Sequence, residues 1–309
     1  MLPGESPTCR FPMPYVLVLL LLFGAQGGEK PHRQVIVWGK NTPEWNRQLG
    51  VTGARTGCSD TPPSCIARAN SFASEGVQVF LAVPLRKDTL AYSAEYVKLS
   101  STAPSLVEIG IDDFADQYRK LIASDADAPA LLNAFIDAVE REGGQLKFGA
   151  TIYEDDLDSP ELSDAKLPVS IRRKFDFVHL YLHYRSDAAR MPEYFRRAVT
   201  LFPGAKIFLG VYAYDRISYI PCAKGDSRPC TQAEEMKYLG EALDADLALL
   251  KEDAAGLEFY PGSFGIEQEW TGWERPNVCP GRKQECLENT KALRLLVLEK
   301  LQGAHIAGK

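Results

Sequence analysis

Two adjacent carboxylates, Asp112 and Asp113, close a short apolar segment at residues 105–113 (SLVEIGIDD). Side chains alternate along a strand, so Asp112 is expected to face inward above Gly110, while Asp113 turns over the strand end. Two acids so close disfavour joint ionisation, and one can then keep a proton near neutral pH and serve as a general acid. The alternative is that Asp113 caps a helix beginning at Phe114.

The elements that must position these acids alternate between apolar segments and helix-length stretches. Eight strands are expected, at residues 34–39, 50–56, 77–84, 105–113, 146–154, 175–184, 206–215 and 256–260. Continuous apolar strands between helices indicate a parallel sheet covered on its faces, and eight such units predict an α/β fold of the (β/α)8 TIM-barrel type. A doubly wound open sheet is the alternative, but the Gly-x-Gly-x-x-Gly turn after the first strand is absent.

The first residues have the layout of an export signal. Arg10 precedes the apolar run at 15–23, and small residues follow it, so residues 1–27 are predicted to be a signal peptide and 28–309 the barrel. The run is too short for a permanent membrane span, although an uncleaved anchor is the alternative. We therefore expect a secreted or periplasmic protein with no permanent membrane span once the signal is cleaved.

The cysteines support the same compartment. Cys9 precedes the apolar run, and the remaining cysteines form three close pairs around short polar stretches: Cys58 with Cys65, Cys222 with Cys230, and Cys279 with Cys286. Local disulfides are the expected state of such pairs in an exported chain. All three pairs follow strand ends, so they are predicted to staple loops at the C-terminal mouth of the barrel.

Aromatic and charged residues gather at the predicted strand ends, where the loops of a barrel converge on one mouth. Rings that stack on sugar faces, beside acids that accept hydroxyl hydrogen bonds, are typical of carbohydrate sites. The expected substrate-binding residues are Trp38, Arg55, Tyr153, Tyr181, Tyr212, Tyr214, Glu258, Tyr260 and Trp270, with Trp273 nearby. The predicted partner is an oligosaccharide or polysaccharide.

Other chemistries lack their residues. The net charge of −6 and the absence of basic runs argue against nucleic acid. His179 and His183 share a strand face but lie roughly 13 Å apart, too far for one metal ion, and no Gly-rich phosphate or nicotinamide loop is present. We expect neither a metal nor a cofactor.

The segment from Gly110 to Phe114 (GIDDF) at the end of the fourth strand resembles glycoside hydrolases that use substrate-assisted catalysis, especially the β-N-acetylglucosaminidase group that includes O-GlcNAcase and hyaluronidase-like enzymes. The resemblance implies an N-acetylhexosamine substrate, with Asp112 orienting the acetamido group and Asp113 as acid/base. The chain departs from the chitinase pattern Asp-x-x-Asp-x-Asp-x-Glu, because Gly110 stands where an acid is expected.

Two alternatives to that mechanism stay open. A two-carboxylate hydrolase would pair Asp113 as acid with Glu154, Asp215 or Glu258 as nucleophile or base. A barrel that binds a glycan or a cell-surface partner without cleaving it would keep the aromatic residues but would not need a proton-holding acid.

Overall fold

The computed structural model describes residues 33–39, 43–72, 75–142, 144–214, 221–260 and 284–306. The predicted leader 1–27, the acid Asp215, the tryptophans Trp270 and Trp273, and Cys279 lie outside the described residues. The described residues from Arg33 onward belong to one compact unit.

The strands close into a parallel barrel in the order β1 to β8, which confirms the predicted TIM-barrel fold. They are β1 (Gln34–Trp38), β2 (Gly53–Gly57), β3 (Gln78–Val83), β4 (Leu106–Ile111), β5 (Lys147–Tyr153), β6 (Phe177–Tyr181), β7 (Lys206–Tyr212) and β8 (Gly256–Tyr260). The barrel closes where β1 pairs with β8, from Gln34 opposite Gly256 to Val37 opposite Phe259.

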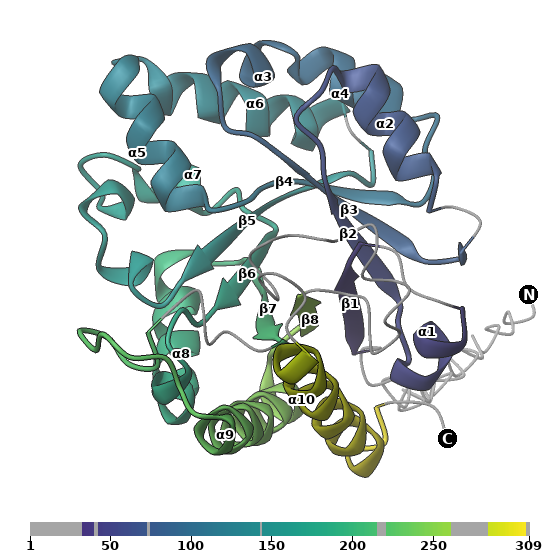
Figure 1. Cartoon of the computed structure of the whole chain (residues 1–309). Coiled ribbons are helices and arrows are strands. Elements are labelled where there is room, and N and C mark those ends of the chain that lie inside the picture. The colour runs from purple at the N-terminus through teal and green to yellow at the C-terminus, as the bar shows by residue number, and fades with distance from the viewer. Residues whose placement is uncertain are drawn as a thin grey trace, which may run out of the picture. The chain divides into compact units, whose positions relative to one another are not determined.

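Helices form a ring outside the strands, from α2, α4 and α6 on one side to α8, α9 and α10 on the other (Figure 1). They are α1 (Pro43–Leu49), α2 (Pro62–Asn70), α3 (Lys87–Ala91), α4 (Ser93–Ser100), α5 (Phe114–Ser124), α6 (Ala128–Glu142), α7 (Val169–Arg172), α8 (Met191–Leu201), α9 (Gln232–Glu252) and α10 (Gln284–Gly303). Short 3-10 helices are η2 (Asp156–Asp158), η3 (Pro160–Leu162) and η4 (Arg185–Arg190). Within the described ranges, no helix has both the length and the apolar character needed to cross a membrane.

Burial periodicity explains how the two layers pack. The strands are buried along nearly their whole length, as in β3, where only Gln78 is exposed. Helix α6 buries one stripe, with Leu132, Phe135, Ile136 and Val139 at three- and four-residue spacing. These faces form one continuous apolar core between sheet and helices.

Several predicted strand limits are wrong. The sixth strand is Phe177–Tyr181 and not 175–184, and the seventh ends at Tyr212 and not at residue 215. Local structure explains two further differences. The second strand begins at Gly53 because the preceding residues close α1: Gly50 has φ 66°, and the Val51 amide donates to Asn46. The fourth strand ends at Ile111, so Asp112 and Asp113 lie in the turn before α5. Asp113 has φ 46° and ψ 48°, a left-handed conformation that cannot continue an extended ladder.

Asp246 is a buried acid on the inner face of α9. Its side chain is 0% exposed, and neither carboxyl oxygen has a hydrogen-bond partner among the described residues. It lines a cavity of about 20 Å³ beside β7. Burial raises the pKa of Asp246 well above its usual value, so the folded protein keeps this carboxyl protonated.

Replacing Asp246 with Asn should therefore make stability less dependent on pH. Above about pH 4 the unfolded chain releases this proton while the folded protein retains it, so the native protein loses stability as pH rises. The unfolding free energy of Asp246→Asn, relative to the native protein, should grow by about 1.4 kcal/mol per pH unit while the folded carboxyl stays protonated. Denaturant melts at a series of pH values measure this slope.

The control is Asp244→Asn, which removes a carboxylate on the same helix that is 63% exposed and paired with Lys300. Its stability difference from the native protein should not show that slope. Parallel pH curves for Asp246→Asn and the native protein would contradict the assignment of a protonated Asp246.

Candidate active site at the barrel mouth

Four charged side chains fill one layer of the barrel interior. Arg55, Glu108, His179 and Glu258 come from β2, β4, β6 and β8, and each is 0% exposed. Alternate strands contribute to the same interior layer of a TIM barrel, which is why these four meet. We call them the ionic tetrad.

The tetrad is a cycle of alternating charges. Arg55 Nη1 lies 3.4 Å from Glu258 Oε2, and Arg55 Nη2 lies 3.9 Å from Glu108 Oε1. His179 Nε2 lies 3.0 Å from Glu108 Oε2, and His179 Nδ1 contacts Glu258 Oε2. Because each imidazole nitrogen faces a carboxylate, the geometry fits a doubly protonated ring.

Electrostatics agree with that protonation. Burial and Arg55 act to lower the pKa of His179, but Glu258 and Glu108 outweigh them and raise it. Burial alone would raise the pKa of Glu258, yet His179 and Arg55 bring it down to about 2. Two cations then balance two anions, so the tetrad is neutral as a unit.

Glycines provide the space that the tetrad and the residues above it need. A Cβ atom at Gly149 would lie 2.5 Å from Glu108 Oε1, and one at Gly210 would lie 2.3 Å from the ring of Tyr181. Neither contact is sterically allowed, so these strand glycines permit the close approach of another side chain.

Glu258 connects the tetrad to the mouth. Its Oε1 accepts hydrogen bonds from the Trp38 indole N–H and, at 2.9 Å, from the Tyr181 hydroxyl. The Arg55 guanidinium lies 5.2 Å from the centre of the Trp38 ring, within range of a cation–π contact. A single buried carboxylate thus holds aromatic residues from two strands, β1 and β6, that are not neighbours in the barrel.

An aromatic wall lines most of the mouth because five strands, β1, β5, β6, β7 and β8, end on an aromatic residue. Neighbouring ring centres are 5.0 to 6.4 Å apart through the series Trp38, Tyr260, Tyr212, Tyr181 and Tyr153. His183 extends the wall by stacking on Tyr153 at 3.7 Å. Strands β2, β3 and β4 end instead on Gly57, Val83 and Ile111, so the wall formed by the described residues is open on the side of the Asp pair.

Asp113 and Asp112 occupy different environments at that opening. Asp113 is exposed at the N-cap position of α5, but its side chain makes no capping hydrogen bond and instead accepts from the Tyr153 hydroxyl at 2.7 Å. Asp112 is mostly buried, and burial followed by repulsion from Asp113 raises its pKa to about 6, against the opposing effect of Arg55. The alternative that Asp113 simply caps α5 through its side chain is therefore wrong.

A second group of acids lies just after β5. Glu154 is only 4% exposed, and its oxygens accept the backbone N–H groups of His183, at 2.7 Å, and Tyr184, at 3.2 Å. Asp155 pairs with His183 Nδ1 at 3.0 Å. Asp156 accepts from the Tyr153 amide at 2.9 Å, and burial raises the pKa of Asp156 to about 6. Glu154 is thus committed to holding the loop after β6.

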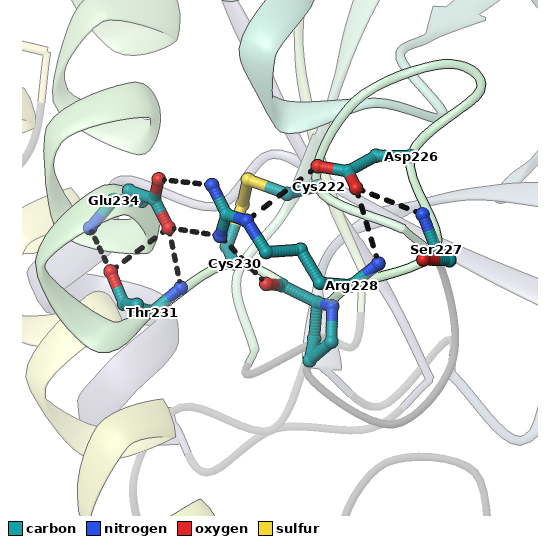
Figure 2. Close-up of polar contacts among 8 residues, drawn as sticks. Cys222, Asp226, Ser227, Arg228, Cys230, Thr231 and Glu234 are labelled. Carbon is teal, nitrogen blue, oxygen red and sulfur yellow. Dashed lines mark hydrogen bonds and ion pairs between the residues drawn. A yellow bond between two sulfur atoms is a disulfide. The ribbon is translucent and has the colours of Figure 1, made fainter.

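The loop that follows β7 is strongly braced (Figure 2). The Cys222–Cys230 disulfide closes it, and Arg228 donates two hydrogen bonds of 2.8 Å to the carboxylate of Glu234. Thr231 and Glu234 form a capping box that starts α9. The described part of this loop, from residue 221 to the start of α9, is therefore held by a disulfide and an ion pair.

The other predicted disulfides follow β2 and β8. Cys58 and Cys65 are bonded directly after β2, as predicted. Cys286 is also disulfide-bonded, while its predicted partner Cys279 lies outside the described residues.

Apart from Glu154, whose carboxylate holds the loop after β6, the predicted site residues fall into three groups. Trp38, Tyr153, Tyr212, Tyr260, Asp112 and Asp113 meet at the mouth. Arg55, Tyr181, Tyr214 and Glu258 are nearly or fully buried, so they support the mouth from within. Asp215 and Trp270 lie outside the described residues.

Sequence reasoning missed the roles of Glu108 and His179. Each is an ionisable residue in the middle of an otherwise apolar strand, which is the signal that a buried charge partner exists. The identity of the partner is a property of the barrel layer and cannot be seen within one strand.

The chain matches no protein-family model and no curated protein sequence. Among solved structures, the Ignisphaera aggregans GH53 catalytic domain has a TM-score of 0.54 at 12% identity, covering 86% of this chain and 96% of that chain. A GH17 β-1,3-glucanosyltransferase from Rhizomucor miehei has a TM-score of 0.49 at 11% identity, covering 76% and 88% respectively. A GH18 chitinase from Pseudoalteromonas aurantia has a TM-score of 0.47 at 10% identity, covering 78% and 96%.

These likenesses concern the fold. This chain has the TIM-barrel architecture seen in the GH53 domain. They give no support for the O-GlcNAcase-like group in particular.

Removing one cation from the tetrad should be costly. In Arg55→Met, two carboxylates share one imidazolium in a water-free interior, and breaking a buried ion network in this way costs about 3–5 kcal/mol. Adding Glu258→Gln restores neutrality and keeps an acceptor for Trp38 and Tyr181. The double variant should therefore unfold at higher denaturant concentration than the sum of the two single losses predicts.

Arg86→Met is the matched control, because its side chain is 53% exposed in an ion pair with Asp88. It should change stability by less than about 1 kcal/mol. Strict additivity of the Arg55 and Glu258 substitutions would show that the tetrad is not an electrostatic unit.

Proposed function

We propose that this protein is a secreted glycoside hydrolase that cleaves a glycan at the barrel mouth, with Asp112 and Asp113 as the reacting carboxyl pair. The observation that carries this proposal is the difference between two adjacent acids. One is mostly buried with its pKa raised to about 6, and the other is exposed and held by a tyrosine hydroxyl. An acid and a carboxylate side by side supply the proton and the negative charge that glycosidic bond cleavage needs.

The surroundings suit a sugar. The aromatic wall offers ring faces for stacking, and its tyrosine hydroxyls offer hydrogen bonds beside them. The wall stops at the Asp pair, so a sugar resting on the rings would present its linkage to the acids. The braced loops after β2 and β7 support secretion, since disulfides persist in oxidising compartments.

An N-acetylhexosamine is the substrate we favour. The two acids come from consecutive positions of one turn, an arrangement that resembles enzymes in which the substrate's own acetamido group attacks the anomeric carbon. Glu154, a candidate nucleophile from the sequence, is held by two backbone amides. Glu258 is fully enclosed in the tetrad. Neither is presented to the mouth as an enzymic nucleophile.

The charge at the described part of the mouth favours neutral sugars. The charges of the tetrad sum to zero, so the tetrad does not neutralise the negative charge of the acids at the rim. Four carboxyl groups lie near the rim, Asp112, Asp113, Asp155 and Asp156, and Lys224 is a cation that acts on Asp155. We therefore expect sulfated or uronate-rich glycans to be repelled.

Amide substitution of each acid tests catalysis. Asp112→Asn and Asp113→Asn should each lower the release of reducing ends by about 10²–10⁴-fold, since general acid–base catalysis contributes that much. Binding of the same glycan, measured by calorimetry, should be retained. Asp88→Asn, at an exposed position on α3, is the control and should leave the rate unchanged.

The screen itself decides between cleavage and binding. If the native protein binds a glycan but releases no reducing ends from any member of a broad panel, the barrel is a binding protein and not a hydrolase.

Substrate charge forms a separate prediction. At low ionic strength, kcat/KM for a neutral N-acetylglucosamine oligomer should exceed that for an oligomer alternating with glucuronate by about tenfold or more, because like charges oppose encounter. Added salt should reduce this ratio. A preference for the glucuronate-containing oligomer would contradict the assignment of a neutral substrate.

A further inference from the structure

The backbone at Asp113 is held in an unusual conformation for a reason other than helix capping. A non-glycine residue with φ 46° and ψ 48° is uncommon, and Asp at an N-cap normally accepts a hydrogen bond from the helix. Here that bond is absent, and Oδ1 accepts from Tyr153 on the neighbouring strand β5. The turn therefore directs the carboxylate toward a specific hydroxyl donor.

That donor is itself oriented by a second tyrosine. The Tyr212 hydroxyl on β7 donates to the Tyr153 oxygen at 3.2 Å, which leaves the Tyr153 proton for Asp113. Burial raises the pKa of Tyr153 well above its usual value, so this phenol keeps its proton and remains a donor. The stack of His183 on Tyr153 fixes the ring in place.

Asp112 lies in a contrasting environment. It is more buried than Asp113, and burial is the largest cause of its raised pKa. The charge of Asp113 adds to this effect, Glu258 contributes in the same direction, and Arg55 opposes both. A proton shared between the two acids is therefore better placed on Asp112.

We propose that Tyr212 and Tyr153 form a hydroxyl relay that holds Asp113 as the anionic member of the pair and so keeps the shared proton on Asp112. Tyr153 acts directly on Asp113, and Tyr212 acts through Tyr153, so both are positioning residues. The importance of the relay for catalysis rests on the proposed hydrolase function, whereas the location of the proton does not. The relay reverses the roles that the resemblance implies, because the proton-holding acid is Asp112.

Other charged groups near the pair bear on its titration. Asp156 in η2 lies close enough to Asp113 for mutual repulsion. Arg55 on β2 and Glu258 on β8 act on Asp112 from inside the barrel. None of these groups is altered by removing a tyrosine hydroxyl, so the tyrosine variants isolate the relay.

The test is a carboxyl titration by carbon NMR in the intact protein without any glycan, with signals assigned from Asp112→Asn and Asp113→Asn. In the native protein, the transition near pH 6 should belong to Asp112 and should vanish in Asp112→Asn. In Tyr153→Phe, the Asp112 transition should move down by about one pH unit, because the hydrogen bond that holds the charge on Asp113 is lost and the shared proton is then less strongly confined to Asp112.

Tyr212→Phe provides the second variant. It should move the Asp112 transition in the same direction by a smaller amount, because Tyr153 loses its orienting donor but still reaches Asp113. If Tyr153→Phe does not fold, the titration of Tyr212→Phe tests the relay. Tyr194→Phe is the matched control, since its hydroxyl bonds Asp187 outside the barrel, and it should leave the Asp112 transition in place.

Two outcomes overturn the relay. One is an Asp112 transition that stays at its native pH in the folded tyrosine variants, and the other is a transition near pH 6 that persists in Asp112→Asn. A pH–rate profile separates this inference from the proposed function. With an active enzyme, the rate should fall as Asp112 loses its proton above about pH 6, and Tyr153→Phe should move that fall to lower pH. Absence of any glycan cleavage, with the NMR shifts intact, would refute the hydrolase alone.

Discussion

The mouth of this barrel depends on a neutral cycle of buried charges. Arg55, Glu108, His179 and Glu258 each lose their hydration entirely, and only mutual pairing makes that burial tolerable. Because each member comes from a different strand, the cycle joins β2, β4, β6 and β8 across the barrel axis. It thereby fixes the relative positions of strands whose ends build the candidate site.

The cycle also fixes the side chains that lie between it and the mouth. The Glu258 carboxylate accepts hydrogen bonds from Trp38 and Tyr181 in addition to pairing with its cationic partners. The absence of a side chain at Gly210 leaves room for the Tyr181 ring. Tyr181 in turn packs against Tyr212 and Tyr153. The aromatic wall is therefore anchored from the interior.

Strand periodicity and the alternation of strands with helices were sufficient to predict the barrel, because each βα unit has a local pattern. The inward direction of Asp112 also follows from alternation along β4. Contacts between strands that are distant in the sequence could not be predicted in this way. The pairing of Glu108 with His179 and of Asp113 with Tyr153 depends on barrel register, which no single segment encodes. The displaced start of β2 likewise reflects how residues 50–52 close α1, a local competition that apolar patterning does not reveal.

Neutrality of the tetrad has a consequence for the acids above it. Arg55 lies near Asp112 and would strongly favour its ionised form if no other charge were present. Glu258 acts against Arg55, in the same direction as burial and Asp113, and the pKa of Asp112 rises to about 6. The interior that holds the barrel together thus leaves at the mouth a carboxyl that keeps its proton up to about pH 6. A tetrad with one anion fewer would have left an unbalanced positive charge below the rim, which would have destabilised the interior and favoured two ionised acids at the mouth.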